Sequence, residues 1–482
     1  MHLGTVLSLL FTGYAAAVAV FLVSENRRPQ STLAWLAALI VVPVLGLPAY
    51  VLFGRGRRAF SRRRVLLMQT LEPTVLPIIA PVLESQKRTI AQLEGESAAH
   101  RRLINLARRN SASLLTRENR VDVLQDAEAF YGRLLEDMRA ARHSIHHQYY
   151  IWRTDSFGQA LKDLLVAKAA DGVEVRVLFD PVGSLADLRP SYFKALRKGG
   201  VKVAPTSSLG AVHTLSYRNH RKITVIDGAV GYTGGMNIGQ EQLDGGPGFT
   251  EWRDTQVRMA GEAAAMLQTV FSVDWYNSTR ENLFSPIYFP EIPDVPDKDE
   301  VPVQILTSGP DSHWAAIRQV YVAMILSAER QVLVQSPFFV PNATVADALR
   351  QAALAGVDVR LMVSARASGN KMPEWATNTY LTEMVEAGVK VLLYERGYLH
   401  AKTIVMDEKV CSIGSTNIDI RSFSINYELN AVIYDRSIAG ALAEDFARDE
   451  AFCRGFSVDE YQARSPLLRF RDSTARLFSP LL

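Results

Sequence analysis

Two groups of polar residues with the same spacing stand 180 residues apart in this chain of 482 residues. In each group a lysine follows a histidine by two positions, an aspartate by seven, a glycine by fourteen and an asparagine by seventeen. The groups are His220, Lys222, Asp227, Gly234 and Asn237, and His400, Lys402, Asp407, Gly414 and Asn417. An imidazole can act as a nucleophile or as an acid and base near neutral pH, and an ammonium group stabilises an anion. Two such sets that converge would suit a reaction at a phosphodiester, for which we expect no metal ion or other cofactor.

The spacing also predicts how these side chains are held. Alternate residues of a strand share a face, so each histidine and lysine would lie about 7 Å apart on one side of a strand. The turn that contains glycine and asparagine would let backbone amides approach an anion closely. One histidine–lysine pair is a weak indication of a site, whereas two copies with matching glycine and asparagine positions are a strong one.

Each imidazole also needs a carboxylate behind it that fixes its tautomer. We expect Asp254 to serve the first copy and Glu428 the second, the alternative being exposed carboxylates on strands. Asp227 and Asp407 belong to the repeated motif but stand five residues beyond each lysine, at the far end of the strand. We therefore expect them to make structural hydrogen bonds. His213, seven residues before His220, is a candidate for the rim of the site.

The elements around the two groups are duplicated as well. Val173–Val177 matches Val357–Leu361, and in both copies a helix that ends in glycine precedes the strand, at Gly172 and Gly356. Short β-branched runs alternate with helical stretches in both halves, which predicts α/β layers. The sequence therefore predicts an α/β fold with two duplicated lobes, each a mixed sheet flanked by helices, packed around one shared site.

Composition excludes several classes of protein. The chain is too long for a single ordinary core, and 21% charged and 48% hydrophobic residues exclude a disordered chain. A net charge of +3 argues against a nucleic-acid binder. Cys411 and Cys453, the two cysteines, are too few for a disulfide scaffold. Nothing in the sequence sets the oligomeric state, so an oligomer stays open.

The hydrophobic residues are concentrated near the N-terminus. Residues 3–23 and 32–53 are uncharged, and each stretch is long enough to cross a hydrocarbon layer of about 30 Å as a helix. We expect a two-helix transmembrane hairpin. Six arginines within residues 55–64 predict that this flank is cytoplasmic, which would place the N-terminus and the catalytic body in the cytoplasm.

These patterns predict the following division of the chain: a membrane anchor with its basic flank (1–64), a helical linker (65–119), lobe 1 (120–285), a proline-rich linker (286–302) and lobe 2 (303–482).

The duplicated motif resembles the signature of the phospholipase D superfamily, HxKxxxxD followed by GxxN in two copies. Further segments are similar to bacterial cardiolipin synthases, so that the resemblance covers the whole chain: Arg27–Trp35, Asp180–Ser184, Trp252–Thr255 and Gly414–Ser422. One departure is Gly235, which stands where the superfamily signature has serine, although Ser415 is present in the second copy. A small residue suffices there, so we expect activity to be kept.

The resemblance implies a phosphatidyltransferase that joins two phosphatidylglycerol molecules reversibly into cardiolipin and glycerol. It implies a phosphohistidine intermediate, with His220 as the nucleophile and His400 as the acid and base. Lys222, Lys402, Asn237 and Asn417 would stabilise charge on the phosphate oxygens. Phospholipids and the membrane are the expected partners, with no nucleic acid. The alternative is a membrane-bound phosphodiesterase of the phospholipase D type that uses water as acceptor.

Overall fold

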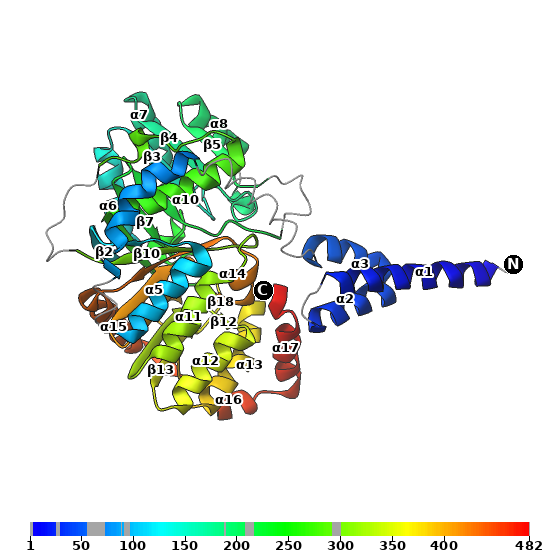
Figure 1. Cartoon of the computed structure of the whole chain (residues 1–482). Coiled ribbons are helices and arrows are strands. Elements are labelled where there is room, and N and C mark those ends of the chain that lie inside the picture. Colours follow the sequence, from blue (N-terminus) through cyan, green and yellow to red (C-terminus); the bar gives the residue numbers. More distant parts are fainter. Residues whose placement is uncertain are drawn as a thin grey trace.

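The computed structural model describes residues 3–25, 29–54, 73–87, 89–90, 97–187, 189–207, 216–291 and 300–481. Figure 1 shows two α/β lobes in contact and a group of N-terminal helices that projects from them on the side of the C-terminus. The basic flank at 55–64, His213 and residues 292–299 of the proline-rich linker lie outside the described residues.

Lobe 1 is built on a seven-stranded sheet with the order β2-β9-β7-β6-β3-β4-β5. Its strands are β2 (Asn119–Gln125), β3 (Ser144–Tyr149), β4 (Glu174–Phe179), β5 (Lys202–Pro205), β6 (Ile223–Ile226), β7 (Val230–Gly234) and β9 (Thr255–Gly261). The helices are α6 (Asp126–Ala140), α7 (Ser156–Ala170), α8 (Pro190–Lys198), α9 (Glu241–Asp244) and α10 (Glu262–Thr279). The pairs β3–β4 and β4–β5 are parallel and the others antiparallel, so the sheet is mixed.

Lobe 2 repeats this sheet strand for strand. Its order is β1-β10-β19-β17-β16-β11-β13-β14-β20, in which β1 and β20 are additions at the two edges. The strands are β1 (Leu115–Thr116), β10 (Val303–Ser308), β11 (Gln331–Ser336), β13 (Asp358–Ser364), β14 (Lys390–Tyr394), β16 (Thr403–Met406), β17 (Val410–Gly414), β19 (Glu428–Ile433) and β20 (Cys453–Gly455). The helices are α11 (Ala316–Ser327), α12 (Ala343–Leu354), α13 (Met372–Glu386), α14 (Ile420–Ser424), α15 (Arg436–Glu450), α16 (Val458–Gln462) and α17 (Pro466–Leu477). The predicted α/β duplication is confirmed.

The segment before lobe 1 contributes to lobe 2. Helix α5 (Ala98–Ser111) packs against α11 and β10, and β1 pairs antiparallel with β10. Leu103 and Ile104 of α5 are fully buried in the core of lobe 2. This segment therefore ties the start of lobe 1 to the sheet of lobe 2.

Equivalent helices of the two lobes begin and end with equivalent signals. The Asp155 carboxylate accepts the amide of Gly158 (3.0 Å) at the start of α7, and the Asn342 side chain accepts the amide of Val345 (3.1 Å) at the start of α12. Gly172 and Gly356 follow these helices with φ of 89° and 92°, a conformation that glycine adopts without steric cost. The same local chemistry thus sets both helices.

One hydrophobic core joins the lobes. It contains Val225 and Leu267 of lobe 1 together with Leu333, Val405 and Leu429 of lobe 2. The neighbouring residues Ile226 and Ile404 point to the opposite faces of their sheets, into the cores beneath the outer helices. Each sheet is therefore buried on both faces, and the lobes hold a fixed position relative to each other.

Residues 32–53 do not form the single helix that the sequence predicts. Helix α1 (Leu3–Ser24) is followed by α2 (Pro29–Val41), a break at Val42, α3 (Pro43–Ala49) and a π-helical turn, η1 (Tyr50–Gly54). A Cβ on Gly46 would lie 2.4 Å from the carbonyl oxygen of Ala38, whereas residues eight apart in one helix are about 12 Å apart. Helix α3 therefore folds back over α2, because Pro43 cannot continue the hydrogen-bonding pattern of α2.

Within the described residues, α1 alone is long and apolar enough to span a membrane. Helix α2 has 13 residues, about 20 Å, which is short of a hydrocarbon layer. The Tyr50 ring returns to within 5.2 Å of Trp35, and its hydroxyl donates to Glu25 (2.7 Å) at the end of α1. A segment that folds back returns the chain to the side it came from. The cytoplasmic N-terminus that the sequence predicts depends on two full spans and stays a prediction.

We predict that Leu267→Ala lowers the free energy of unfolding by about 2–5 kcal/mol, because it leaves a cavity in the core shared by the lobes. Denaturant unfolding of the detergent-solubilised protein measures this. The control is Leu354→Ala on α12, whose side chain is 74% exposed. Equal effects of the two variants would contradict a shared core.

Candidate functional site

The two histidines lie just before equivalent strands at the boundary between the lobes. His220 precedes β6 and His400 precedes β16, so the histidine–lysine pairs stand in extended segments that lead into the strands, and not within them. The His220 amide donates to the carbonyl of Tyr427 (2.9 Å), and the His400 amide donates to the carbonyl of Arg253 (2.7 Å). Each histidine segment is thus hydrogen-bonded to the other lobe, immediately before that lobe's predicted carboxylate.

The carboxylates pair with the histidines across the boundary. Nδ1 of His220 lies 3.0 Å from Oε2 of Glu428, and Nδ1 of His400 lies 2.6 Å from Oδ2 of Asp254. Both carboxylates are fully buried, and the imidazoles are 9% and 13% exposed. The prediction that Asp254 serves the first copy and Glu428 the second is wrong, because the strand pairing between lobes brings each carboxylate to the histidine of the opposite copy.

A short strand pair strengthens one of these connections. β8 (Trp252–Arg253) of lobe 1 runs parallel to β15 (Tyr398–Leu399) of lobe 2, directly before Asp254 and His400. On the other side, Asn219 forms an isolated bridge with Tyr427, directly before His220 and Glu428. The two connections are related by the duplication and bring both imidazoles to one shared centre.

Gly235 departs from the superfamily signature for a steric reason. A Cβ on this residue would lie 2.1 Å from Oδ1 of Asp254, which is held there by the Thr255 amide (2.7 Å) and by His400. In the other copy the Ser415 hydroxyl donates to the longer side chain of Glu428. The two copies therefore pair glycine with aspartate and serine with glutamate.

The lysines are buried at the same centre. The Lys222 ammonium donates to the carbonyl of His220 (2.9 Å), and the Lys402 ammonium donates to the carbonyl of His400. Burial lowers the pKa of Lys222 to about 7 and that of Lys402 to about 8, against the opposing attraction of Glu428 and Asp254. Two buried cations without a bound anion make the centre a receptor for negative charge.

Burial lowers the pKa of both histidines. Burial lowers the pKa of His220, and the nearby ammonium groups add to this while Glu428 opposes it. Burial and Lys402 lower the pKa of His400 to about 3, against the attraction of Asp254. Burial alone would raise the pKa of Glu428, but His220, Lys222 and the Ser415 hydroxyl hold it below its usual range. Each imidazole thus donates from Nδ1 to an ionised Glu428 or to Asp254 and leaves Nε2 free to accept a proton or bond to phosphorus.

Asp227 and Asp407 lie away from this centre. Asp227 accepts the backbone amides of Arg142, His143 and Ser144 at 2.7–2.9 Å, where β3 begins. Asp407 accepts the amides of Glu329, Arg330 and Gln331 at 2.8–3.0 Å, where β11 begins. Both adopt a left-handed backbone with φ of 53° and 52°. Their role in the structure is to hold equivalent strand starts.

The asparagines differ in their contacts. The Asn237 side-chain oxygen accepts the amide of Ile151 (3.3 Å), whereas the buried side-chain oxygen of Asn417 has no hydrogen-bond partner among the described residues. Both side chains are buried after the strands that carry the glycines. Asn417 is thus the more available of the two for a bound group.

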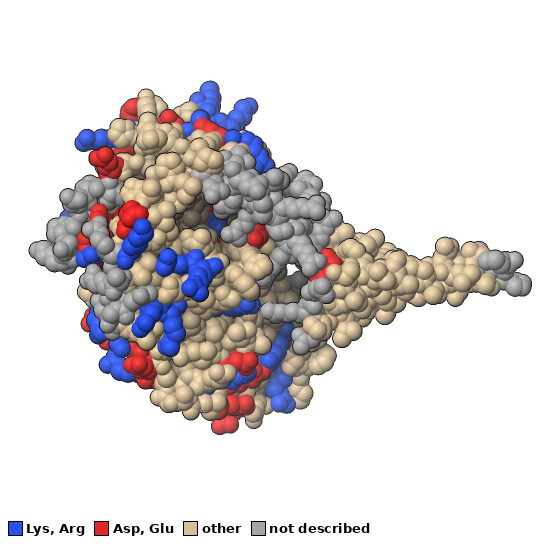
Figure 2. Space-filling model, in the orientation of Figure 1, with Lys and Arg blue, Asp and Glu red and all other residues tan. Residues whose placement is uncertain are grey.

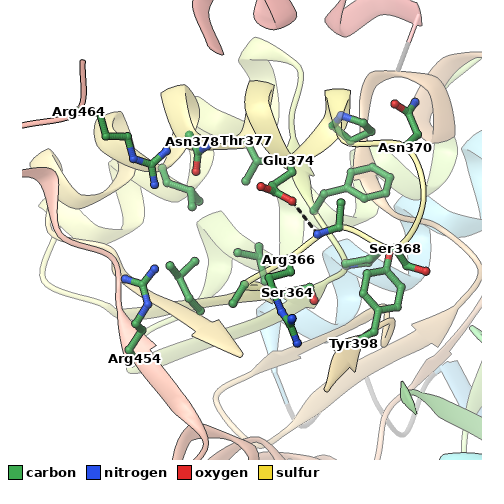
Figure 3. Close-up of a pocket in the computed structure, with 18 residues that line it drawn as sticks. Ser364, Arg366, Ser368, Asn370, Glu374, Thr377, Asn378, Tyr398, Arg454 and Arg464 are labelled. Atoms are coloured by element: carbon green, nitrogen blue, oxygen red, sulfur yellow. Dashed lines mark hydrogen bonds between the residues drawn. The ribbon is translucent and has the colours of Figure 1, made fainter. Parts of the chain in front are cut away.

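Aromatic rings line the centre, and a cavity lies behind one of them. Tyr150 packs edge-on against His220 with ring centres 4.7 Å apart, and Tyr398 lies 5.8 Å from His400. Tyr398 also lines a cavity of about 170 Å³ in lobe 2, at the opposite end from Arg454 and Arg464 (Figure 3). Those arginines pair with Glu395 and Asp472, whereas Arg366, which also lines the cavity, lies over the ring of Phe249.

Comparisons with known proteins agree with this geometry. Residues 134–275 and 321–450 match the family model described as cardiolipin synthase, PLD-like domain, and residues 11–55 match the model described as phospholipase D-nuclease N-terminal. The fold is also similar to a phosphatidylserine synthase from Haemophilus influenzae, with a TM-score of 0.58 and 15% identity over 75% of this chain and 95% of that one. Fold and site therefore define a two-lobed protein of the phospholipase D class.

Curated relatives narrow the class. The chain is 39% identical to the major cardiolipin synthase ClsA of Bacillus subtilis, over 100% of both chains. It is 38% identical to a cardiolipin synthase of Geobacillus thermodenitrificans, over 99% of this chain and 94% of the relative. The chain belongs to the cardiolipin synthase family.

The signals available in the sequence did not reveal two features. The crossing of the carboxylates depends on contacts between the lobes, which the spacing within each repeat does not contain. The sequence shows that glycine stands at position 235 in place of serine. The reason, the close approach of Asp254 to this residue, is seen only in the structure.

We predict that Gly235→Ser lowers activity at least tenfold, although serine is the residue of the superfamily signature, because its side chain displaces Asp254 from His400. A matched comparison is Ser415→Gly, which creates no clash. The double variant Gly235→Ser/Asp254→Glu reproduces the pairing of the second copy and should recover part of the loss. Product formation under identical detergent conditions measures all three, and a fully active Gly235→Ser variant would contradict this explanation.

Proposed function

We propose that the protein transfers a phosphatidyl group from one phosphatidylglycerol molecule to another, giving cardiolipin and releasing glycerol. The observation that carries this proposal is the pair of histidine–carboxylate contacts around two buried lysines at one centre. Such a centre offers a nucleophile, a proton carrier and positive charge for a phosphodiester. The named relatives supply the substrate class, since they are cardiolipin synthases.

In the first step, Nε2 of His220 attacks the phosphorus of the donor lipid. The bond from phosphorus to the glycerol oxygen breaks, and that oxygen takes a proton from His400 and leaves as free glycerol. A bound phosphodiester places negative charge beside Lys222 and Lys402, which offsets their repulsion and raises the pKa of His400 toward the range in which it carries this proton. Glu428 stabilises the positive charge that forms on His220.

In the second step, His400 accepts the proton of the acceptor hydroxyl while the hydroxyl oxygen attacks phosphorus. The bond from phosphorus to His220 breaks, and both histidines return to their starting state. Lys222, Lys402, Asn237 and Asn417 act on the non-bridging oxygens in both steps. The first step exchanges a phosphorus–oxygen bond for a phosphorus–nitrogen bond, and the second step does the reverse. The overall reaction therefore replaces one phosphoester by another and is reversible.

We propose that the protein acts at a bacterial inner membrane. The apolar side chains of Leu10, Val20 and Val23 on α1 are more than half exposed. Figure 2 shows the N-terminal helices with almost no charged residues and the lobes with many. Glu25 is the only charged residue among the described residues before position 55. The six arginines of residues 55–64 favour a cytoplasmic position for the lobes.

We predict that His220→Ala and His400→Ala each lower cardiolipin formation about a thousandfold or more, because neither copy supplies both roles alone. The control variant is His143→Ala. The side chain of His143 is exposed, and its backbone amide, which the substitution keeps, donates to Asp227. Mass spectrometry of products formed from phosphatidylglycerol in detergent measures the rates. A residual rate above about a tenth of the unmodified protein's rate, in either variant, would refute the two-histidine mechanism.

We predict that excess glycerol converts cardiolipin back to phosphatidylglycerol, because the bonds exchanged are nearly equal in energy. Isotope-labelled glycerol should appear in the phosphatidylglycerol formed. If cardiolipin and glycerol gave only phosphatidic acid, water would be the acceptor and the protein would be a phosphodiesterase of the phospholipase D type.

A further inference from the structure

Two arginines beside His220 are not explained by the steps above. Arg218 stands two residues before His220 in an extended segment, where its carbonyl accepts the amide of Tyr427 (2.8 Å). Residues two apart in an extended chain share a face and have Cα atoms about 7 Å apart. Arg218 therefore reaches the same side of the segment as the imidazole.

The second arginine comes from the other lobe. Arg421 is carried by α14, which follows the Gly414–Asn417 segment of the second motif, and its guanidinium donates to the carbonyl of Ser216. Ser216 lies two residues before Arg218, so the two guanidinium groups meet at the boundary between the lobes. Burial lowers the pKa of Arg421, and the repulsion of Arg218 lowers it further.

Neither arginine has a carboxylate partner within ion-pair distance in the described part of the chain. Nη1 of Arg218 is buried and makes no hydrogen bond there. The nearest acidic groups are engaged elsewhere: Asp180 accepts the amides of Val182, Gly183 and Asn219 at 2.9–3.0 Å, and Asp419 accepts the amide and hydroxyl of Ser422. Two adjacent, half-buried cations that form no ion pair with a carboxylate among the described residues make a site for an anion.

The chemistry of the product indicates which anion. In cardiolipin two phosphates are joined through a three-carbon glycerol, so six bonds of about 1.5 Å separate the phosphorus atoms, which lie at most roughly 7–8 Å apart. An acceptor lipid poised for attack must therefore hold its own phosphate about that far from the catalytic centre.

We propose that Arg218 and Arg421 bind the phosphodiester of the acceptor lipid. This inference rests on the proposed transferase function and adds the position of the second substrate. The Tyr150 ring packs against His220 on one side and lies 5.4 Å from the Lys222 ammonium, so it forms a wall of the donor site next to the arginines. Binding the acceptor phosphate there would present its hydroxyl to phosphorus and favour a lipid over water.

The test compares acceptors that differ only in the phosphate. With phosphatidylglycerol as donor in detergent micelles, the acceptors are labelled glycerol, which has no phosphate, and glycerophosphoglycerol, which has a phosphodiester but no acyl chains. The measured quantity is the rate of transfer to glycerophosphoglycerol divided by the rate of transfer to glycerol. We expect Arg218→Gln and Arg421→Gln each to lower this ratio at least tenfold, and Arg421→Lys to lower it less.

Arg330→Gln is the matched control, since this side chain is 66% exposed and removes the same charge from a distant surface. An unchanged ratio in the arginine variants would overturn the proposal. If cardiolipin formation on vesicles fell while the ratio stayed unchanged, the arginines would bind bilayer headgroups and not the acceptor. Equal losses with both acceptors would overturn it as well, since the arginines would then serve the donor or the fold. If the unmodified protein gave only phosphatidic acid with every acceptor, the transferase function itself would fail, which is seen before any variant is compared.

Discussion

Each imidazole of this centre is hydrogen-bonded to a carboxylate from the opposite lobe, and the rest of the architecture serves that crossed arrangement. Glu428 holds His220 and Asp254 holds His400, at 3.0 and 2.6 Å. A carboxylate that fixes an imidazole loses its effect if it shifts by about an ångström. The lobes must therefore keep one relative position, and the hydrophobic core that contains residues of both sheets provides it. Neither lobe contains a complete histidine–carboxylate pair alone.

The centre concentrates charge that would be costly to bury without compensation. Lys222 and Lys402 are almost completely buried, and the pKa of each is lowered to about 7 and 8. Glu428 and Asp254 offset part of this cost. An arriving phosphodiester supplies the remaining negative charge, so binding relieves a repulsion already present in the folded protein. Arg218 and Arg421 extend the same principle to a neighbouring position, where the repulsion of Arg218 lowers the pKa of Arg421 and the attraction of Asp419 and Asp180 opposes it.

The sequence predicted those features that local spacing determines. The repeat of strands and helices, the helix ends at Gly172 and Gly356, and the two histidine–lysine groups all follow from residue types at fixed intervals. Features that depend on long-range contacts escaped it. The crossing of Asp254 and Glu428 arises where the lobes pair, and the fold of α3 over α2 arises because Pro43 interrupts a stretch whose hydrophobicity is uniform. Arg218 carries no motif, and only the structure reveals that its buried Nη1 makes no hydrogen bond within the described part of the chain.

The two copies of the motif have diverged at the carboxylate. Glu428 accepts a hydroxyl from Ser415 in addition to His220, whereas Gly235 leaves Asp254 with the Thr255 amide and His400. A hydrogen bond to an ionised carboxylate stabilises its charge and makes it a weaker base toward the imidazole. His220 and His400 therefore differ in the hydrogen bonds that their carboxylates accept although their motifs match, and burial lowers the pKa of both imidazoles. Gly235 with the shorter Asp254 is therefore the place where the surroundings of the two imidazoles become inequivalent in this chain.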